Sequence, residues 1–142
     1  MKRSARLASA SLAPVEKQLP PVPAAAELNR LVMDLDSEVF DIREKAARDL
    51  SEIGDGAEPA LRRALESKPP LELRRRTEVL LKALDEPAAV GKRLYAQRTV
   101  AVLEYAGGTE ARQLLERLAA GAPQARLTQR ARVALARLTK AG

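Results

Sequence analysis

The sequence of 142 residues contains no histidine, cysteine or tryptophan, and its aromatic residues are Phe40, Tyr95 and Tyr105. Without histidine and cysteine it lacks the usual ligands of zinc, haem iron and iron–sulfur clusters, and it has no imidazole for a catalytic triad. We therefore predict a protein that is not an enzyme and that binds no cofactor or metal ion. An enzyme that works through carboxylates or lysine alone is the least favoured alternative.

The sequence also lacks a long apolar run. Lys2, Arg3 and Arg6 precede the stretch from Leu7 to Val15, but that stretch is mostly alanine and serine and is broken by Pro14, so we do not expect a secretion signal. No other segment approaches the roughly 18–20 apolar residues of a membrane-spanning helix. We expect a soluble protein without a membrane partner. Since cysteine is absent, nothing indicates the redox compartment, and the cytoplasm is the default location.

What the chain does contain is typical of helices. Hydrophobic residues make up 46% of the sequence and charged residues 31%, and alanine, leucine, arginine and glutamate dominate the two classes. The length suits one modest domain, since domains usually have about 100–200 residues. We predict an all-α protein whose core is built from leucine, valine, isoleucine and alanine.

Proline and glycine divide the chain into segments. Four prolines fall within residues 1–23, where apolar periodicity is weak, so we predict a flexible amino-terminal tail there and a helical domain over residues 24–142. Pairs such as Pro69 with Pro70 and Gly107 with Gly108 mark breaks between helices. The predicted helices span residues 24–35, 38–53, 56–67, 70–84, 91–106, 109–120 and 125–139.

Apolar residues recur at helical spacing in several of these stretches. The second carries Val39, Ile42, Ala46, Leu50 and Ile53 on one face, and the fifth carries Tyr95, Thr99, Val102, Leu103 and Ala106. Short helices cannot bury such stripes alone, so stacked helix–turn–helix pairs are the economical arrangement. We predict a short α-solenoid of about seven helices, and a compact helical bundle is the alternative.

One segment resembles a known repeat. Residues 34–54 followed by residues 58–65 are similar to the HEAT-like repeats named after phycobilisome lyases. The matching features are Ile42-Arg43, Ala46-Ala47, Leu50, Ile53-Gly54 and the helix that begins Pro59-Ala60-Leu61. Over about residues 19–140 the chain also looks like a helical region of large bacterial proteins, commonly downstream of a WD-repeat β-propeller. The resemblance implies a HEAT-like fold and an interaction module without assigned chemistry, and it leaves open whether the chain is part of a larger protein.

Arg43 lies beside the apolar stripe of the second stretch. Similar repeats place an arginine there that bonds to an acidic residue or a helix end of a neighbouring repeat. We interpret Arg43 and Asp41 as structural residues between repeats, with Asp49 as a second partner for the arginine. A ligand-binding role for Arg43 is the less favoured reading.

The last predicted helix offers the candidate interaction surface. Arg126, Arg130 and Arg137 fall on one flank, with Lys140 near them, and residues 122–142 contain five basic and no acidic side chains. Residues 24–60 are acidic by contrast, and such polarity orients partners or promotes head-to-tail contact. We predict a protein–protein interaction scaffold that binds an unidentified protein or neighbouring domain. The alternative is electrostatic binding of a nucleic-acid backbone through the basic helix. The sequence does not fix the oligomeric state.

Overall fold

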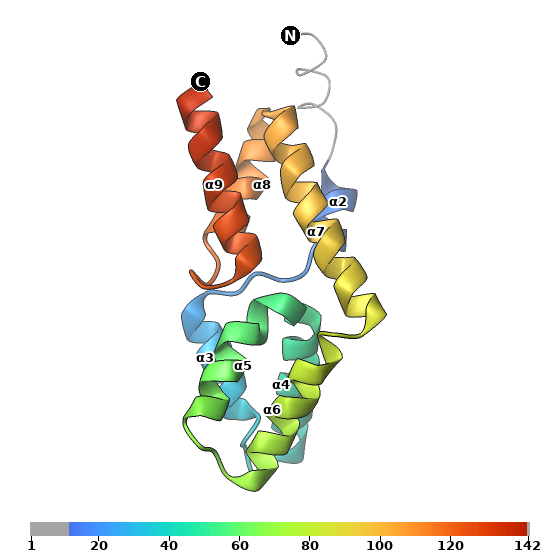
Figure 1. Cartoon of the computed structure of the whole chain (residues 1–142), viewed down its shortest axis with the longest axis vertical. Helices are drawn as coiled ribbons and strands as arrows, with labels where there is room; N and C mark the ends of the chain where they lie inside the picture. The colour runs from blue at the N-terminus through green and yellow to red at the C-terminus, as the bar shows by residue number, and fades with distance from the viewer. Residues whose placement is uncertain (1–11, 142) are drawn as a thin grey trace.

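The computed structural model describes residues 12–141, and this part of the chain is helical and contains no strand (Figure 1). One short 3-10 helix, η1 (Gly54–Ala57), follows directly after α4. The α-helices are α2 (Ala13–Gln18), α3 (Ala25–Asp34), α4 (Phe40–Ile53), α5 (Glu58–Glu66), α6 (Leu71–Ala83), α7 (Pro87–Ala106), α8 (Thr109–Ala119) and α9 (Arg126–Ala141).

The all-α class and the seven helices expected after residue 24 are confirmed by α3 to α9. Gly54 and Gly107 end α4 and α7 with positive φ angles of 65°, a conformation that costs glycine little. Proline is the second residue of α5 and the first of α7, in a turn where its missing N–H group leaves no helical bond unmade. Because Pro87 can start a helix, α7 begins four residues before its predicted start at residue 91.

The helices form two halves that follow one another along the molecule (Figure 1). In the N-terminal half, residues 24–86, α3 packs on α4 and α5 on α6, while α3 also contacts α5 and α4 contacts α6. In the C-terminal half, residues 87–141, α7, α8 and α9 all contact one another. Two stacked pairs thus adjoin a three-helix unit, and the predicted solenoid through all seven helices is not confirmed by this arrangement.

Each half has its own buried cluster, and the two meet at a junction. The cluster of the N-terminal half includes the fully buried Leu35 and Leu61, and that of the C-terminal half includes Leu115 and Ala131. Ala122 and Ala125 belong to the C-terminal half but are buried in the first cluster. The 3-10 helix η1 contacts both α7 and α9, so the halves are joined by packed side chains as well as by the α6–α7 turn.

The structure corrects two predicted apolar stripes. In α4, Ala46, Leu50 and Ile53 are buried, but Val39 and Ile42 are exposed because they lie beside the first turn of the helix, at the end of the half. In α7, the buried residues are Ala96, Thr99, Val100 and Leu103, whereas Tyr95 and Val102 are exposed. Because α7 carries apolar residues on most of its sides, helical periodicity does not identify the buried side, and the prediction included Tyr95 and Val102 wrongly.

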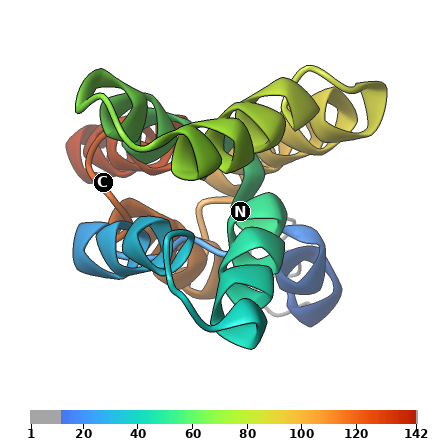
Figure 2. The same cartoon turned by 90° about the horizontal axis from the view of Figure 1, so that it is seen from below.

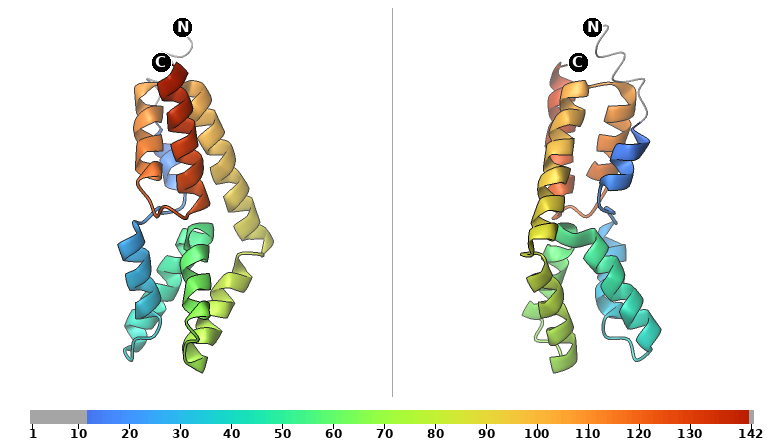
Figure 3. Two further views of the ribbon diagram at one scale, coloured as in Figure 1. Left: turned by 60° about the vertical axis from the view of Figure 1, so that its left-hand side comes forward. Right: turned by 90° about the vertical axis from the view of Figure 1, so that its right-hand side faces the viewer.

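The structure also differs from the predicted amino-terminal tail, of which residues 1–11 lie outside the described residues. Leu12, Leu19 and Val22 pack against the cluster of the C-terminal half, since they supply apolar contacts on both sides of α2. The extended residues 20–23 cross between the two halves (Figure 3). There the backbone N–H of Ala122 donates a hydrogen bond of 3.0 Å to the carbonyl oxygen of Pro23.

Gly121 permits this close crossing. A Cβ atom at this buried position would lie 2.1 Å from Cγ1 of Val22 and 2.5 Å from Oγ1 of Thr128. The Thr128 hydroxyl is itself buried and donates a hydrogen bond of 2.9 Å to the carbonyl oxygen of Leu118. Residues 20–23 therefore rest on the α8–α9 turn at a point where only a hydrogen atom fits.

Candidate interaction surfaces

The predicted basic surface on α9 lies along a groove. Arg126, Arg130 and Arg137 line one side of it, and α7 forms the other side, with a shallow volume of about 460 Å³ between them. Lys140 is exposed in the last turn of the same helix. The three predicted arginines thus line the same groove.

Carboxylates reduce the positive charge of this flank. Arg126 Nη1 lies 3.8 Å from Oδ1 of Asp55, and Arg137 Nη1 lies 3.4 Å from Oε1 of Glu104. Glu104 is also a lining residue of the groove, so a phosphate entering there would meet an acidic side chain. Arg130 is the lining cation without an ion pair among the described residues. The groove is a weaker anion site than the sequence suggests.

Arg43 has a structural contact, but the partner is not the predicted one. Its Nη1 donates a hydrogen bond of 2.8 Å to the carbonyl oxygen of Ser37, in the connection before its own helix. Its guanidinium also lies over the ring of Phe40, 5.6 Å from the centroid. Asp49 binds Lys45, and Asp41 is exposed. The Arg43–Asp41 interpretation is therefore corrected: the arginine secures a turn instead of linking two repeats.

Other arginines do connect neighbouring elements. Arg76 donates to the carbonyl oxygen of Leu35 at 3.0 Å, and Arg93 donates to that of Leu84 at 3.2 Å. Both carbonyls lie at the carboxyl ends of helices, where the last four C=O groups lack intrahelical donors and the helix dipole favours cations. Sequence reasoning missed both contacts because the carbonyls belong to residues 41 and 9 positions away.

The largest exposed apolar feature of the C-terminal half is the outer side of α7. The α7 stripe consists of Leu94, Tyr95, Val102 and Tyr105, which follow one another at steps of one, seven and three residues and so fall within about 100° on one side of the helix. Tyr105 is 86% exposed and Val102 64% exposed. Figure 3 shows α7 and α6 following one another along the length of the molecule. Scattered exposed apolar residues are ordinary, but an aligned set with two tyrosines is typical of a contact surface.

Two cations accompany the α7 stripe. Lys92 and Arg98 are exposed, and neither belongs to the ion pairs of the C-terminal half. Arg98 lies between the two ends of the stripe. The sequence held one signal for this surface: α7 contains more large apolar residues than a single buried face needs.

A second exposed apolar surface surrounds the turn between α3 and α4. Its apolar members, Met33, Val39, Phe40 and Ile42, are all more than 40% exposed. The exposed carboxylates Asp36, Glu38, Asp41 and Glu44 flank them. We name these eight residues the α3–α4 corner.

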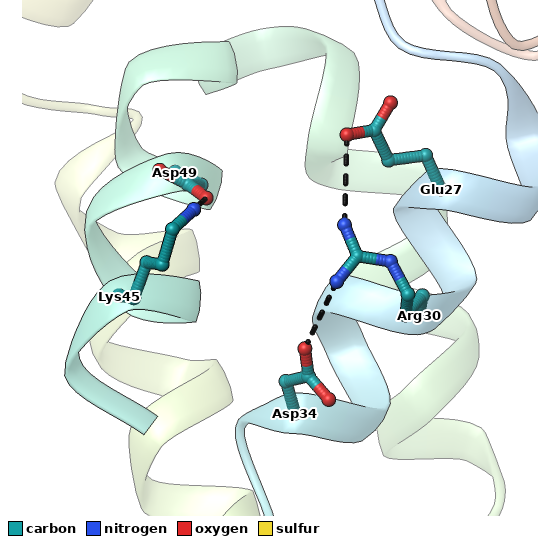
Figure 4. Close-up of polar contacts among 5 residues, drawn as sticks. All are labelled: Glu27, Arg30, Asp34, Lys45 and Asp49. Carbon is teal, nitrogen blue, oxygen red and sulfur yellow. Dashed lines mark hydrogen bonds and ion pairs between the residues drawn. The ribbon is translucent and has the colours of Figure 1, made fainter. Parts of the chain in front are cut away.

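The carboxylates of the corner differ from the others on α3 and α4. Arg30 pairs with Glu27 and Asp34, and Lys45 pairs with Asp49, each within its own helix (Figure 4). None of the four corner carboxylates takes part in an ion pair in the described part of the chain. The corner therefore presents uncompensated negative charge beside apolar side chains.

A cavity of about 300 Å³ lies at the junction of the halves, with a mostly apolar lining that includes residues 20–23, Leu28, Leu84 and Ala96. Nε of Arg93 and Oδ1 of Asp55 are buried in its wall, 3.0 Å apart, as an ion pair without the alignment of a hydrogen bond. The opposite charges of the pair compensate each other, so the cavity wall does not select an anionic or a cationic ligand.

The described residues contain no cluster of three or more acidic side chains arranged to hold a metal ion. Within residues 12–141 no helix has both the length and the apolar character needed to cross a bilayer. Comparisons with protein-family models, with curated proteins and with solved structures find no match to this chain.

Proposed function

We propose that this chain is a non-enzymatic protein–protein interaction scaffold and that the α7 stripe is its docking surface. The single observation that carries the proposal is the exposure of four large apolar side chains on one side of a helix whose opposite side is buried at Ala96, Val100 and Leu103. Removing such a stripe from water stabilises a complex by about 25 cal/mol for each Å² of apolar surface. Tyrosine is also among the residues enriched where proteins bind one another.

The HEAT-like assignment belongs to the same proposal. Its support is the packing of the N-terminal half, where the α3–α4 pair stacks on the α5–α6 pair. In this stack α3 contacts α5, and α4 contacts α6. Stacked pairs of this kind expose apolar residues at the end of an array, because the next pair is missing there. Val39 and Ile42, exposed at the start of α4, fit such an end.

Binding of a nucleic-acid backbone through α9 is the second candidate, and the basic C-terminal half favours it, with ten basic and three acidic side chains in residues 87–141. The ion pairs of Arg126 and Arg137 reduce the charge available to phosphates. Contacts to several phosphates would make the affinity fall steeply with salt.

A nuclease-treated pull-down from native lysate tests the proposal. The bait is the natural chain, and the variant carries Val102→Glu with Tyr105→Glu. Val79→Glu is the matched control, since Val79 is 67% exposed on α6. We expect the natural chain and the control to retain the same proteins and the α7 variant to lose them. Equal retention by all three would contradict the α7 docking surface.

The nucleic-acid alternative is examined in the same lysate without nuclease, with an Arg130→Glu and Arg137→Glu variant. Recovery of nucleic acid by the natural chain, lost in this variant and absent above about 0.5 M salt, would replace the scaffold by backbone binding. Far-UV circular dichroism of every variant checks that the helices persist.

A further inference from the structure

The two exposed apolar surfaces of this molecule have opposite charge. The α7 stripe carries Lys92 and Arg98, and the α3–α4 corner carries four carboxylates with Arg43 held against Phe40. The same contrast extends to the halves that bear them. Residues 24–86 contain fifteen acidic and eleven basic side chains, a net charge of −4, whereas residues 87–141 contain ten basic and three acidic ones, a net charge of +7.

The two surfaces cannot meet within one molecule. The α3–α4 turn lies at one end of the elongated molecule, and α7 runs along the other half toward the opposite end (Figure 1). Figure 2 looks at the molecule from the end where this turn lies. Each surface is therefore open to a partner of complementary character.

A symmetric pairing of two α7 stripes is unfavourable. A two-fold axis through the middle of the stripe would bring Arg98 of one copy against Arg98 of the other, and Lys92 would add a second like charge. A symmetric pairing of two corners would likewise oppose four carboxylates with four. The charges favour a contact between unlike surfaces.

We infer that the occupant of the α7 stripe is the α3–α4 corner of a second copy of this chain. This assignment rests on the proposed docking role of the stripe and names its partner. Phe40 and Met33 of one copy cover the tyrosines and Val102 of the next, while Glu38 and Glu44 approach Lys92 and Arg98. Each copy retains one free stripe or corner, so the association is head-to-tail and adds further copies unless a ring closes.

The contact is weak and depends on salt. Four apolar side chains on each surface are fewer than the 20–30 residues a side of a typical stable interface. Raising the salt concentration from about 0.01 M to about 1 M shortens the Debye length from about 30 Å to about 3 Å, and we expect at least a tenfold loss of association.

Sedimentation velocity of charge-reversed variants tests the inference. The first variant, Lys92→Glu with Arg98→Glu, reverses the two cations of the stripe. The second, Glu38→Lys with Glu44→Lys, reverses the two carboxylates that approach them, so that the four charged side chains of the corner sum to zero. We expect the natural chain to show a mass that rises with concentration at low salt and each variant alone to stay monomeric. An equal mixture of the two should associate head-to-tail with the variants alternating. The intact corner of the first variant meets the intact stripe of the second, and the substituted corner of the second meets the substituted stripe of the first. The chain with all four substitutions should associate again, since both signs are exchanged.

Three results would overturn the inference: a natural chain that stays monomeric up to about 1 mM, two variants that each associate like the natural chain, or a mixture that remains monomeric. Circular dichroism confirms that each variant is folded before it is compared. If the natural chain stays monomeric in sedimentation but the Val102→Glu with Tyr105→Glu variant loses the proteins captured in the pull-down, the partner is not a second copy. The α7 stripe then remains the docking surface for another protein. If the natural chain neither associates with itself nor captures proteins through the α7 stripe, the proposed function is wrong as well.

Discussion

The two halves of the molecule use their charged side chains differently. In the N-terminal half the ion pairs follow single helices at spacings of three or four residues, as with Arg30 and Asp34 or Lys45 and Asp49 (Figure 4). In the C-terminal half the arginines pair with carboxylates on other segments, as with Arg93 and Asp55 or Arg117 and Glu16.

The ion pairs of the two halves therefore contribute differently to stability. An exposed pair within one helix contributes only about 0.3–0.5 kcal/mol, because both side chains are solvated and must be ordered. A pair that joins two segments also fixes their relative position, and it is stronger where it is shielded from water. The N-terminal half is thus held mainly by apolar packing, whereas the C-terminal half and the junction add electrostatic links.

The largest effects should come from the apolar clusters of the two halves. Leu50→Ala and Leu115→Ala each remove a buried side chain, and each should lower the free energy of unfolding by about 2–5 kcal/mol. Urea unfolding measures the loss. Both tyrosines lie on α7, so their fluorescence reports the C-terminal half while circular dichroism reports all helices. Because the junction is packed, we expect the two signals to coincide in both variants. Separate transitions would show that the halves unfold independently.

A substitution at Gly121 examines the link between the amino-terminal segment and the C-terminal half. Gly121→Val forces side-chain atoms into Val22 and Thr128, and overpacking of this kind should lower the free energy of unfolding by about 1–3 kcal/mol. Gly91→Ala is the control, since no atom lies within 4 Å of its Cβ position, and it should stabilise α7 by up to about 1 kcal/mol. Thermal denaturation of both variants gives the comparison. A neutral Gly121→Val would mean that residues 20–23 are not held against the turn.

Two arginine substitutions sharpen the contrast between ion pairs. Arg93→Met removes the nearer of the two cationic partners of the shielded Asp55 carboxylate and a donor to the Leu84 carbonyl, so it should cost about 1–3 kcal/mol of unfolding free energy. Arg62→Met breaks the exposed pair with Glu58 on α5 and should cost at most about 0.5 kcal/mol. Urea denaturation at low and high salt measures both. Equal costs would remove the distinction between the two halves.

The smallest expected effect belongs to one of two buried hydroxyl groups. Thr128 donates across the α8–α9 turn to the carbonyl of Leu118, so Thr128→Val should cost about 1 kcal/mol of unfolding free energy. Thr77 donates to the carbonyl of Leu73 in its own helix at 2.8 Å, where the carbonyl keeps its helical partner, so Thr77→Val should change stability by only a few tenths of a kcal/mol. Thermal unfolding of the pair tests this order. A larger loss at Thr77 would contradict it.

Local signals explain what the sequence predicted well. Gly54, Gly107, Pro70 and Pro87 act within a turn or two of where they stand, and so the seven helices were found with small errors at their ends. Surfaces that depend on distant segments were less predictable. The prediction that Tyr95 is buried is wrong because both sides of α7 are apolar. The buried side is the one that α8 and α9 cover, and the sequence of α7 alone does not show which side that is. The HEAT-like assignment and the interaction function stay predictions.

The α9 surface shows the same division. The spacing of Arg126, Arg130 and Arg137 predicts one flank, and the three side chains line one groove. Their ion pairs were not predictable, because Asp55 is 71 positions before Arg126 and Glu104 is on a helix whose orientation was unknown. The α3–α4 corner was likewise missed, since Val39 and Ile42 follow the pattern of buried residues.

The crossing of residues 20–23 also bears on the order in which the protein takes shape during synthesis. Glu16 and Pro23 are made early, but their partners Arg117 and Ala122 are about 100 positions later. Contacts so distant along the chain form after local ones, because a long loop must close first. The N-terminal half can pack its four helices as soon as they are complete. Residues 12–23 therefore find their place only once α8 and the turn after it have been made, so this segment packs after helices that follow it in the sequence.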